Sequence, residues 1–127
     1  MSQVLLVVEE SRVDWFYANL PQVLPENTEV TVAYDDGEAK DFLSPEESDI
    51  CLVVVGIFPG RTAHTFGGPN LIRDMRRVGH TFSIVVVSGS PQYNREALDA
   101  GANHESNLQS FKSSMRPVVV KAFGLSR

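Results

Sequence analysis

The sequence predicts an α/β domain in which a doubly wound, five-stranded parallel sheet carries helices on both faces. Segments with the pattern of a strand alternate with segments with the pattern of a helix along the whole chain. Three strand segments, 4–8, 50–57 and 83–88, are almost entirely apolar, which is typical of strands buried on both faces. Because 127 residues suffice for one hydrophobic core, we expect a single domain over residues 1–127.

The first strand segment, VLLVV, is followed by a helical segment. Ser11 is expected to cap this helix, and Leu20, which precedes a proline, is expected to end it. The apolar residues that recur at helical spacing, and should face the core, are Val13, Phe16, Tyr17 and Leu20. Trp15 lies off this stripe. Either its ring folds over the helix edge, which we favour, or it anchors a protein interface.

The remaining segments complete five strand–helix units. Strands are predicted at 29–34, 50–57, 83–88 and 103–107, and helices at 37–43, 71–79, 91–100 and 114–124. Gly79 should follow the end of its helix in a left-handed conformation. Pro117 is expected in the first turn of the last helix, where its missing N–H is harmless.

Composition indicates an ordinary water-soluble protein, with 43% hydrophobic and 21% charged residues. No apolar run approaches the roughly 18 residues that a membrane-spanning helix needs, so we expect no membrane partner. The start of the chain lacks the pattern of an export signal. Cys51 is the only cysteine and lies inside an apolar strand segment. These features predict a cytoplasmic protein without disulfides.

The net charge of −5 conceals two halves of opposite sign. Residues 1–49 hold twelve acidic and two basic side chains, whereas residues 50–127 hold four acidic and nine basic ones. An acidic domain disfavours non-specific nucleic-acid binding. The basic stretch contains Arg61, His64, Arg73, Arg76, Arg77 and His80. It is either an anion patch or, as we favour, a solvated helix face. The asymmetry also suits a protein partner of complementary charge, or a homodimer.

Several polar residues follow the predicted strands, at the edge where parallel sheets gather their ligands. These strand tips are Glu9-Glu10, Asp35-Asp36, 55–59, 88–90 and 105–108. At the tips the chain resembles the receiver domain of bacterial two-component response regulators. The matching stretches are VLLVVEES, VTVAYDDGEAKDFL, VVVGIFPGR, GGPNLIRDMRRVG, SIVVVSGS and EALDAGAN. The resemblance implies a flavodoxin-like fold with strand order 2-1-3-4-5. It also implies phosphoryl transfer from a histidine kinase to an aspartate, with Mg²⁺ bound.

The resemblance places the residues of the phospho-acceptor pocket only in part. The acidic pair of the family falls on Glu9 and Glu10, the hydroxyl that ends the fourth strand falls on Ser88, and the conserved lysine falls on Leu108. The acceptor aspartate falls on Val55, and no neighbouring register supplies an acid because none lies between residues 50 and 73. The switch aromatic of the family falls on Glu105, beside His104.

Valine cannot form an acyl phosphate, because that bond requires a carboxylate nucleophile. The missing lysine removes the cation that would stabilise the transferred oxygens. We therefore expect a pseudo-receiver that is not an enzyme, needs no cofactor and signals through protein–protein contact. Glu9 and Glu10 are the candidates for a Mg²⁺ site, with Asp35 or Asp36 beside them, but two adjacent glutamates predict poor occupancy.

Two questions stay open at this stage. The alternative function is a receiver gated by a displaced phosphorylation site, such as His64 or Ser88, or by a bound small ligand. The candidate residues for contact with a partner are Trp15, His104 and Glu105. The loop at 59–70 is expected over the mouth of the pocket, where it either binds a partner, acts as a lid or is a flexible spacer.

Overall fold

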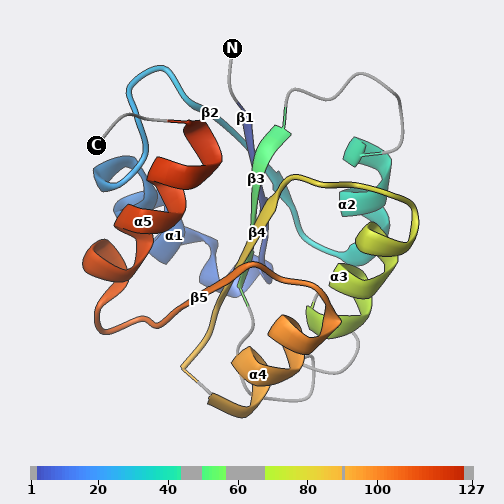
Figure 1. The fold of residues 1–127 in the computed structure, drawn as a ribbon. Coiled ribbons are helices and arrows are strands. Elements are labelled where there is room, and N and C mark those ends of the chain that lie inside the picture. Colours follow the sequence, from blue (N-terminus) through green and yellow to red (C-terminus); the bar gives the residue numbers. More distant parts are fainter. Residues whose placement is uncertain (1–2, 44–49, 57–67, 90, 125–127) are drawn as a thin grey trace.

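The computed structural model describes residues 3–43, 50–56, 68–89 and 91–124. Its strands are β1 (Gln3–Val7), β2 (Glu29–Ala33), β3 (Ile50–Gly56), β4 (Ser83–Val87) and β5 (His104–Ser106). They form one parallel sheet in the order β2-β1-β3-β4-β5 (Figure 1). The predicted fold class and strand order are therefore confirmed.

Helices cover both faces of the sheet (Figure 1). They are α1 (Val13–Asn19), α2 (Asp36–Leu43), α3 (Gly68–Arg77), α4 (Pro91–Ala100) and α5 (Phe111–Phe123), with short 3₁₀ turns η1 (Glu10–Arg12) and η2 (Leu20–Gln22) at the two ends of α1. One face is covered by α1 and α5, and the other by α2, α3 and α4. Among the described residues, no helix is long and apolar enough to cross a membrane.

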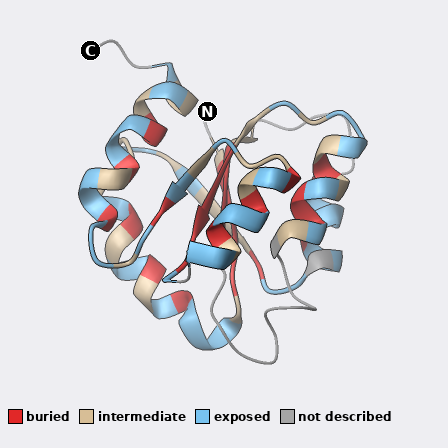
Figure 2. Cartoon of the chain, turned by 60° about the horizontal axis from the view of Figure 1, so that its bottom comes forward, coloured by how far each residue is buried: buried red, intermediate tan, exposed pale blue. Residues whose placement is uncertain are grey.

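The strands bury alternate residues in two separate cores. Leu5 and Val7 pack with the α2, α3 and α4 side, whereas Val4, Leu6 and Val8 pack with the α1 and α5 side. All five are fully buried. Each such side chain contributes about 1.5–3 kcal/mol by leaving water. Figure 2 shows the same division, with buried residues on the inward faces of the helices and exposed ones outward.

The start of α1 differs from the prediction. Ser11 does not cap the helix, because residues 10–12 form η1, in which the Arg12 N–H donates to the Glu9 carbonyl. Tyr17 does not face the core, since its side chain is 53% exposed. The helix is only seven residues long, and Val13 and Phe16, followed by Leu20 in η2, fill its narrow core stripe.

The ring of Trp15 packs between α1 and α5. It meets the rings of Phe16 and Phe111 edge-to-face, each at a centroid distance of 5.0 Å. It is half-buried and belongs to the rim of the α1 and α5 core. This geometry matches the interpretation that the ring folds over the helix edge and ties α1 to α5. A role in partner contact stays a prediction.

The end of α3 agrees with the prediction, whereas the start of α5 does not. Gly79 adopts φ +102° after α3, and the bonds from Gly79 N to Arg76 O and from His80 N to Met75 O close the helix as predicted. Pro117 lies inside α5 and not in its first turn. The helix begins three residues earlier than predicted, because the Asn107 carboxamide accepts from the Ser110 N–H just before it.

Arg76 joins α3 to the loop that follows it and to the turn before β5, which lies far along the sequence. Its guanidinium donates to the carbonyls of Gly101, His80 and Phe82, each at 2.9 Å, and to Asn103 Oδ1 at 2.6 Å. Asn103 Oδ1 also accepts from the Ile84 N–H. Burial lowers the pKa of the Arg76 guanidinium from its ordinary value. Arg76 is therefore a structural link, and neither a solvated residue nor part of an anion patch.

Candidate functional site

The parallel register brings the tips of all five strands to one edge of the sheet. Val7 pairs with Ala33 and with Val55, so the ends of β1, β2 and β3 lie level. The pairing continues from Gly56 to Val87 and from Val87 to Ser106, which brings in β4 and β5. This edge is the lower end of the sheet in Figure 1. The predicted pocket residues of separate strands are thus brought to one region.

The centre of this edge is hydrocarbon. Val55 is fully buried and packs in the core on the α2, α3 and α4 side. Its neighbour Gly56 has no room for a side chain: a Cβ there would lie 3.0 Å from two ring atoms of Phe16 and 3.3 Å from Val8. Val54 is buried in the opposite core. In the described strand β3, then, neither Val55 nor its neighbours Val54 and Gly56 present a side-chain oxygen.

The two members of the acidic pair at the end of β1 differ in exposure and in their place in the backbone. Glu9 is half-buried and precedes η1, whereas Glu10 is exposed within it. Across the described ranges, no cluster of three or more His, Cys, Asp or Glu side chains could hold a metal ion. Mg²⁺ prefers near-octahedral oxygen ligands and usually needs carboxylates assisted by substrate. The residues present here do not fit such a site.

Asp35 at the end of β2 is engaged in local structure. Its Oδ1 accepts from the Glu38 N–H at 2.8 Å, and Glu38 Oε1 accepts in turn from the Tyr34 N–H at 2.7 Å. This reciprocal pair caps the start of α2, where unpaired N–H groups need acceptors. One oxygen of the Asp35 carboxylate, which was expected beside Glu9 and Glu10, is therefore engaged in the cap of α2.

Two tyrosines flank this acidic corner. Tyr34 is 37% exposed and lies beside the exposed Tyr17. Partial desolvation raises the pKa of the Tyr34 phenol, and neighbouring Tyr17 and the Glu10 carboxylate raise it further. The Tyr34 phenol thus stays protonated at neutral pH.

The other end of the edge is polar and buried. Ser88 is fully buried, its N–H donates to the Ser106 carbonyl at 3.2 Å, and its carbonyl accepts from Asn94 Nδ2 at 3.5 Å. Asn94 Oδ1 is buried and has no hydrogen-bond partner among the described residues. The Ser106 hydroxyl is buried and hydrogen bonds with the Ser114 hydroxyl of α5. Sequence reasoning identified Ser88 but missed Asn94 and Ser106, whose only signal is a polar residue in a mostly apolar segment.

In the described part of the chain, no lysine ammonium makes a hydrogen bond or an ion pair with the residues at the centre of the edge. Leu108 lies two residues beyond β5, half-buried against the α1 and α5 core. The chain has only three lysines. Lys40 pairs with Asp74 at 3.0 Å, while Lys112 and Lys121 lie on α5, the second of them near His104.

His104 and Glu105 lie on the short edge strand β5. Glu105 is exposed, whereas His104 is half-buried and its Nε2 is buried without a hydrogen-bond partner in the described part of the chain. Burial lowers the pKa of His104, and the charge of Lys121 lowers it further. The ring is therefore neutral near pH 7. Their role in partner contact remains a prediction, and His64, Arg61 and most of the 59–70 loop lie outside the described residues.

Comparison with known proteins rests on structure. No protein-family model matches the sequence, and no curated protein matches it. Solved structures match over nearly the full length. A response regulator receiver domain protein from Clostridium thermocellum gives a TM-score of 0.74 at 13% identity, covering 98% of this chain and 95% of that one.

Two further structures show the same likeness. The signal receiver domain of an HD domain-containing protein from Pseudomonas fluorescens Pf-5 gives a TM-score of 0.73 at 17% identity, covering 97% of this chain and 94% of that one. The response regulator TrrA from Thermotoga maritima, solved in complex with Mg²⁺ and BeF, gives 0.66 at 20% identity, covering 99% of this chain and all of that one. The chain therefore has the fold of response regulator receiver domains.

Proposed function

We propose that this protein is a non-enzymatic, receiver-like signalling module that acts through protein–protein contact in a two-component pathway. In this proposal it is not phosphorylated at the usual position. One observation carries the proposal: the tip of β3 presents the buried hydrocarbon of Val55, and the ring of Phe16 occupies the space beside Gly56. The receiver fold supports the class of pathway.

The chemistry of the edge supports the same conclusion. An acyl phosphate needs a carboxylate nucleophile, and Val55 has none. Phosphoryl transfer also relies on cations to stabilise the transferred oxygens. Leu108 stands at the position that the family gives to lysine, and among the described residues Glu9 and Glu10 belong to no cluster of three or more metal-ligating side chains. We infer that the output depends on partner binding or dimerisation, in the cytoplasm.

Incubation with acetyl phosphate and Mg²⁺, followed by intact mass measurement, tests the proposal. The purified chain should gain no phosphoryl group under conditions that fully modify a receiver domain carrying the usual aspartate. That second protein is the matched control, because it shares the fold and differs at the β3 tip. Stoichiometric modification of this chain would overturn the proposal.

A second candidate function is a receiver gated at Ser88 or by a small ligand, with His64 as the other displaced acceptor. The observation in its favour is the buried Asn94 Oδ1 next to the Ser88 carbonyl, which has no hydrogen-bond partner among the described residues and is costly without a donor. Ser88 itself is fully buried, which disfavours direct phosphorylation. Titration with a nucleotide panel while amide shifts of 88–94 are followed tests it. Saturable shifts there would favour this candidate over the first.

A further inference from the structure

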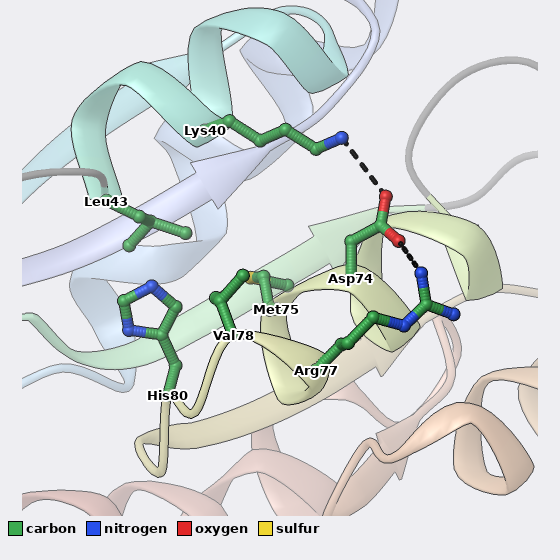
Figure 3. Close-up of a pocket in the computed structure, with 7 residues that line it drawn as sticks. All are labelled: Lys40, Leu43, Asp74, Met75, Arg77, Val78 and His80. Carbon is green, nitrogen blue, oxygen red and sulfur yellow. Dashed lines mark hydrogen bonds and ion pairs between the residues drawn. The ribbon is translucent and has the colours of Figure 1, made fainter.

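A groove of about 510 Å³ opens between the C-terminal turns of α2 and α3. Figure 3 shows its lining residues, which come from both helices and from the turn after α3: Lys40, Leu43, Asp74, Met75, Arg77, Val78 and His80. None of them belongs to the strand-tip edge described above. The groove volume lies within the range of natural binding sites, about 300–1,000 Å³.

The floor of the groove is apolar and extends onto the surface. Leu43 and Met75 are only 2% exposed and form the base. Val78 stands at the rim with 73% of its surface exposed. A single exposed apolar residue is common, but Val78 extends the apolar floor of the groove outward, and an exposed apolar surface beside a groove is of the kind that marks an interaction site.

The rim of the groove is net positive although the whole chain is acidic. Asp74 lies 3.0 Å from Lys40 Nζ and 3.4 Å from an Arg77 nitrogen. The hydrogen bond and charge of Lys40 lower the pKa of Asp74, and Arg77 and Arg73 lower it further. Among the groove-lining residues, Lys40 and Arg77 thus outnumber the single carboxylate of Asp74, so the remaining positive charge favours an anionic group on an incoming partner.

The wall that carries the exposed apolar rim is held in place. Arg76 donates to the His80 and Phe82 carbonyls at 2.9 Å, and the His80 ring stacks on Phe82 at a centroid distance of 4.9 Å. Gly79 closes α3 between Val78 and His80. A preformed wall loses little conformational entropy when a partner binds.

We propose that this α2–α3 groove docks an acidic amphipathic helix of a partner protein. Apolar residues one turn apart would lie along Leu43, Met75 and Val78, and flanking carboxylates would meet Lys40 and Arg77. The proposal rests on the function proposed above, because it names the partner class of a module that signals by contact. It concerns a surface separate from the strand tips.

Two features favour this occupant over others. The exposed apolar side chain of Val78 stands at the rim, where a small ligand inside the cavity would leave it uncovered. A second copy of the chain fits less well. Each of the five described helices lays buried residues on its own sheet, so none has a free apolar stripe to offer.

Titration of the full chain with two synthetic amphipathic helices tests the proposal. Both peptides carry leucine on one face; one carries glutamate on its flanks and its twin carries lysine. The glutamate peptide should bind saturably and shift backbone amides in 40–43 and 74–80. The lysine twin should bind at least about tenfold more weakly, because it meets the positive rim.

Charge reversal sharpens the test. Arg77→Glu should weaken binding of the glutamate peptide about tenfold, and Lys40→Glu combined with Arg77→Glu should make the lysine twin the better ligand. Arg116→Glu, an exposed cation on α5, is the matched control and should leave both affinities unchanged. Circular dichroism checks that each variant folds.

Three outcomes would overturn the docking proposal. These are equal affinity for both peptides, shifts centred on α5 or the strand tips, and equal losses from Arg77→Glu and Arg116→Glu. Binding of octanoate in the groove while the glutamate peptide is silent would reassign it to a small amphipathic anion. None of these results touches phosphoryl uptake at the strand tips, so failure here and failure of the proposed function are distinguishable.

Discussion

The tip of β3 is held by apolar packing, whereas the junction around Arg76, between α3 and the turns that it binds, is held by hydrogen bonds. At the tip, Phe16 presses against Gly56 and Val55 is buried, so the space is filled by hydrocarbon. At the junction, four hydrogen bonds from the Arg76 guanidinium on α3 satisfy acceptors in the loop before β4 and the turn before β5. The β3 tip, where phosphoryl chemistry would be expected, is therefore filled by apolar side chains, whereas the Arg76 hydrogen bonds serve a structural link. The sheet and its helices are therefore packed together without a reactive pocket at the β3 tip.

Removing the guanidinium should have the largest effect on stability. Arg76→Ala leaves the carbonyls of Gly101, His80 and Phe82 without their donor, and we expect a loss of about 3–4 kcal/mol in the free energy of unfolding. Urea denaturation measures it. Arg73→Ala is the matched control, since that exposed side chain bonds only Asn70 among the described residues, and should change stability by less than about 0.5 kcal/mol. Equal effects from both would refute the structural link.

Crowding the β3 tip should have the next largest effect. Gly56→Ala forces a Cβ to within 3.0 Å of Phe16, and overpacking of this kind costs about 1–3 kcal/mol. Gly89→Ala, where nothing lies within 4 Å, should be nearly neutral.

A double-mutant cycle sharpens this prediction. In a Phe16→Leu background the added cost of Gly56→Ala should shrink, because the ring atoms that it meets are gone. An unchanged cost would show that the ring does not close the tip. Thermal and urea unfolding of the four proteins give the coupling energy.

The cap of α2 offers a smaller test at the same edge. Asp35→Ala removes the acceptor of the Glu38 N–H, and we expect a loss of about 1 kcal/mol in unfolding free energy. Asp99→Ala is the control. Asp99 is an exposed acid in the last turn of α4, so its removal should not destabilise the chain. If Asp35→Ala is neutral, the carboxylate is not committed to the cap and is again available as a ligand.

The smallest expected effect is the pH dependence from His104. Its folded-state pKa is lowered, first by burial and then by Lys121, so protonation favours the unfolded state. The contribution is fully present above the ordinary pKa of about 6.5 and is lost as pH falls below it. His104→Gln should therefore flatten stability between about pH 7.5 and 5, measured by urea denaturation at each pH. An equally steep loss in the variant would contradict this assignment.

Local patterns in the sequence predicted the strands and their shared edge better than the exact bounds of the helices. The apolar runs in β1, β3 and β4 require burial on both faces, and parallel strands bring their tips together, so Glu9, Val55 and Ser88 were correctly expected at one edge. Tyr17 and Pro117 were misplaced because their positions depend on where α1 and α5 begin, which neighbouring segments decide. The strand order followed from the resemblance.

Other features depend on contacts that no local pattern encodes. In the sequence Arg76 is one of several basic residues, because the Gly101 carbonyl that it binds belongs to a distant turn. Asn94 and Ser106 gain significance only through burial against β4 and α5. The α2–α3 groove arises where two helix ends meet, and its charge balance depends on Asp74 lying between Lys40 and Arg77.

Beryllofluoride, a mimic of the phosphoryl group, gives the most direct test of the closed β3 tip. Titrated with Mg²⁺ into the labelled chain, it should leave the amide shifts of Glu9, Gly56 and Ser88 unchanged, because the edge lacks both the carboxylate and the cation that would hold it. Saturable shifts at these three residues would contradict the account.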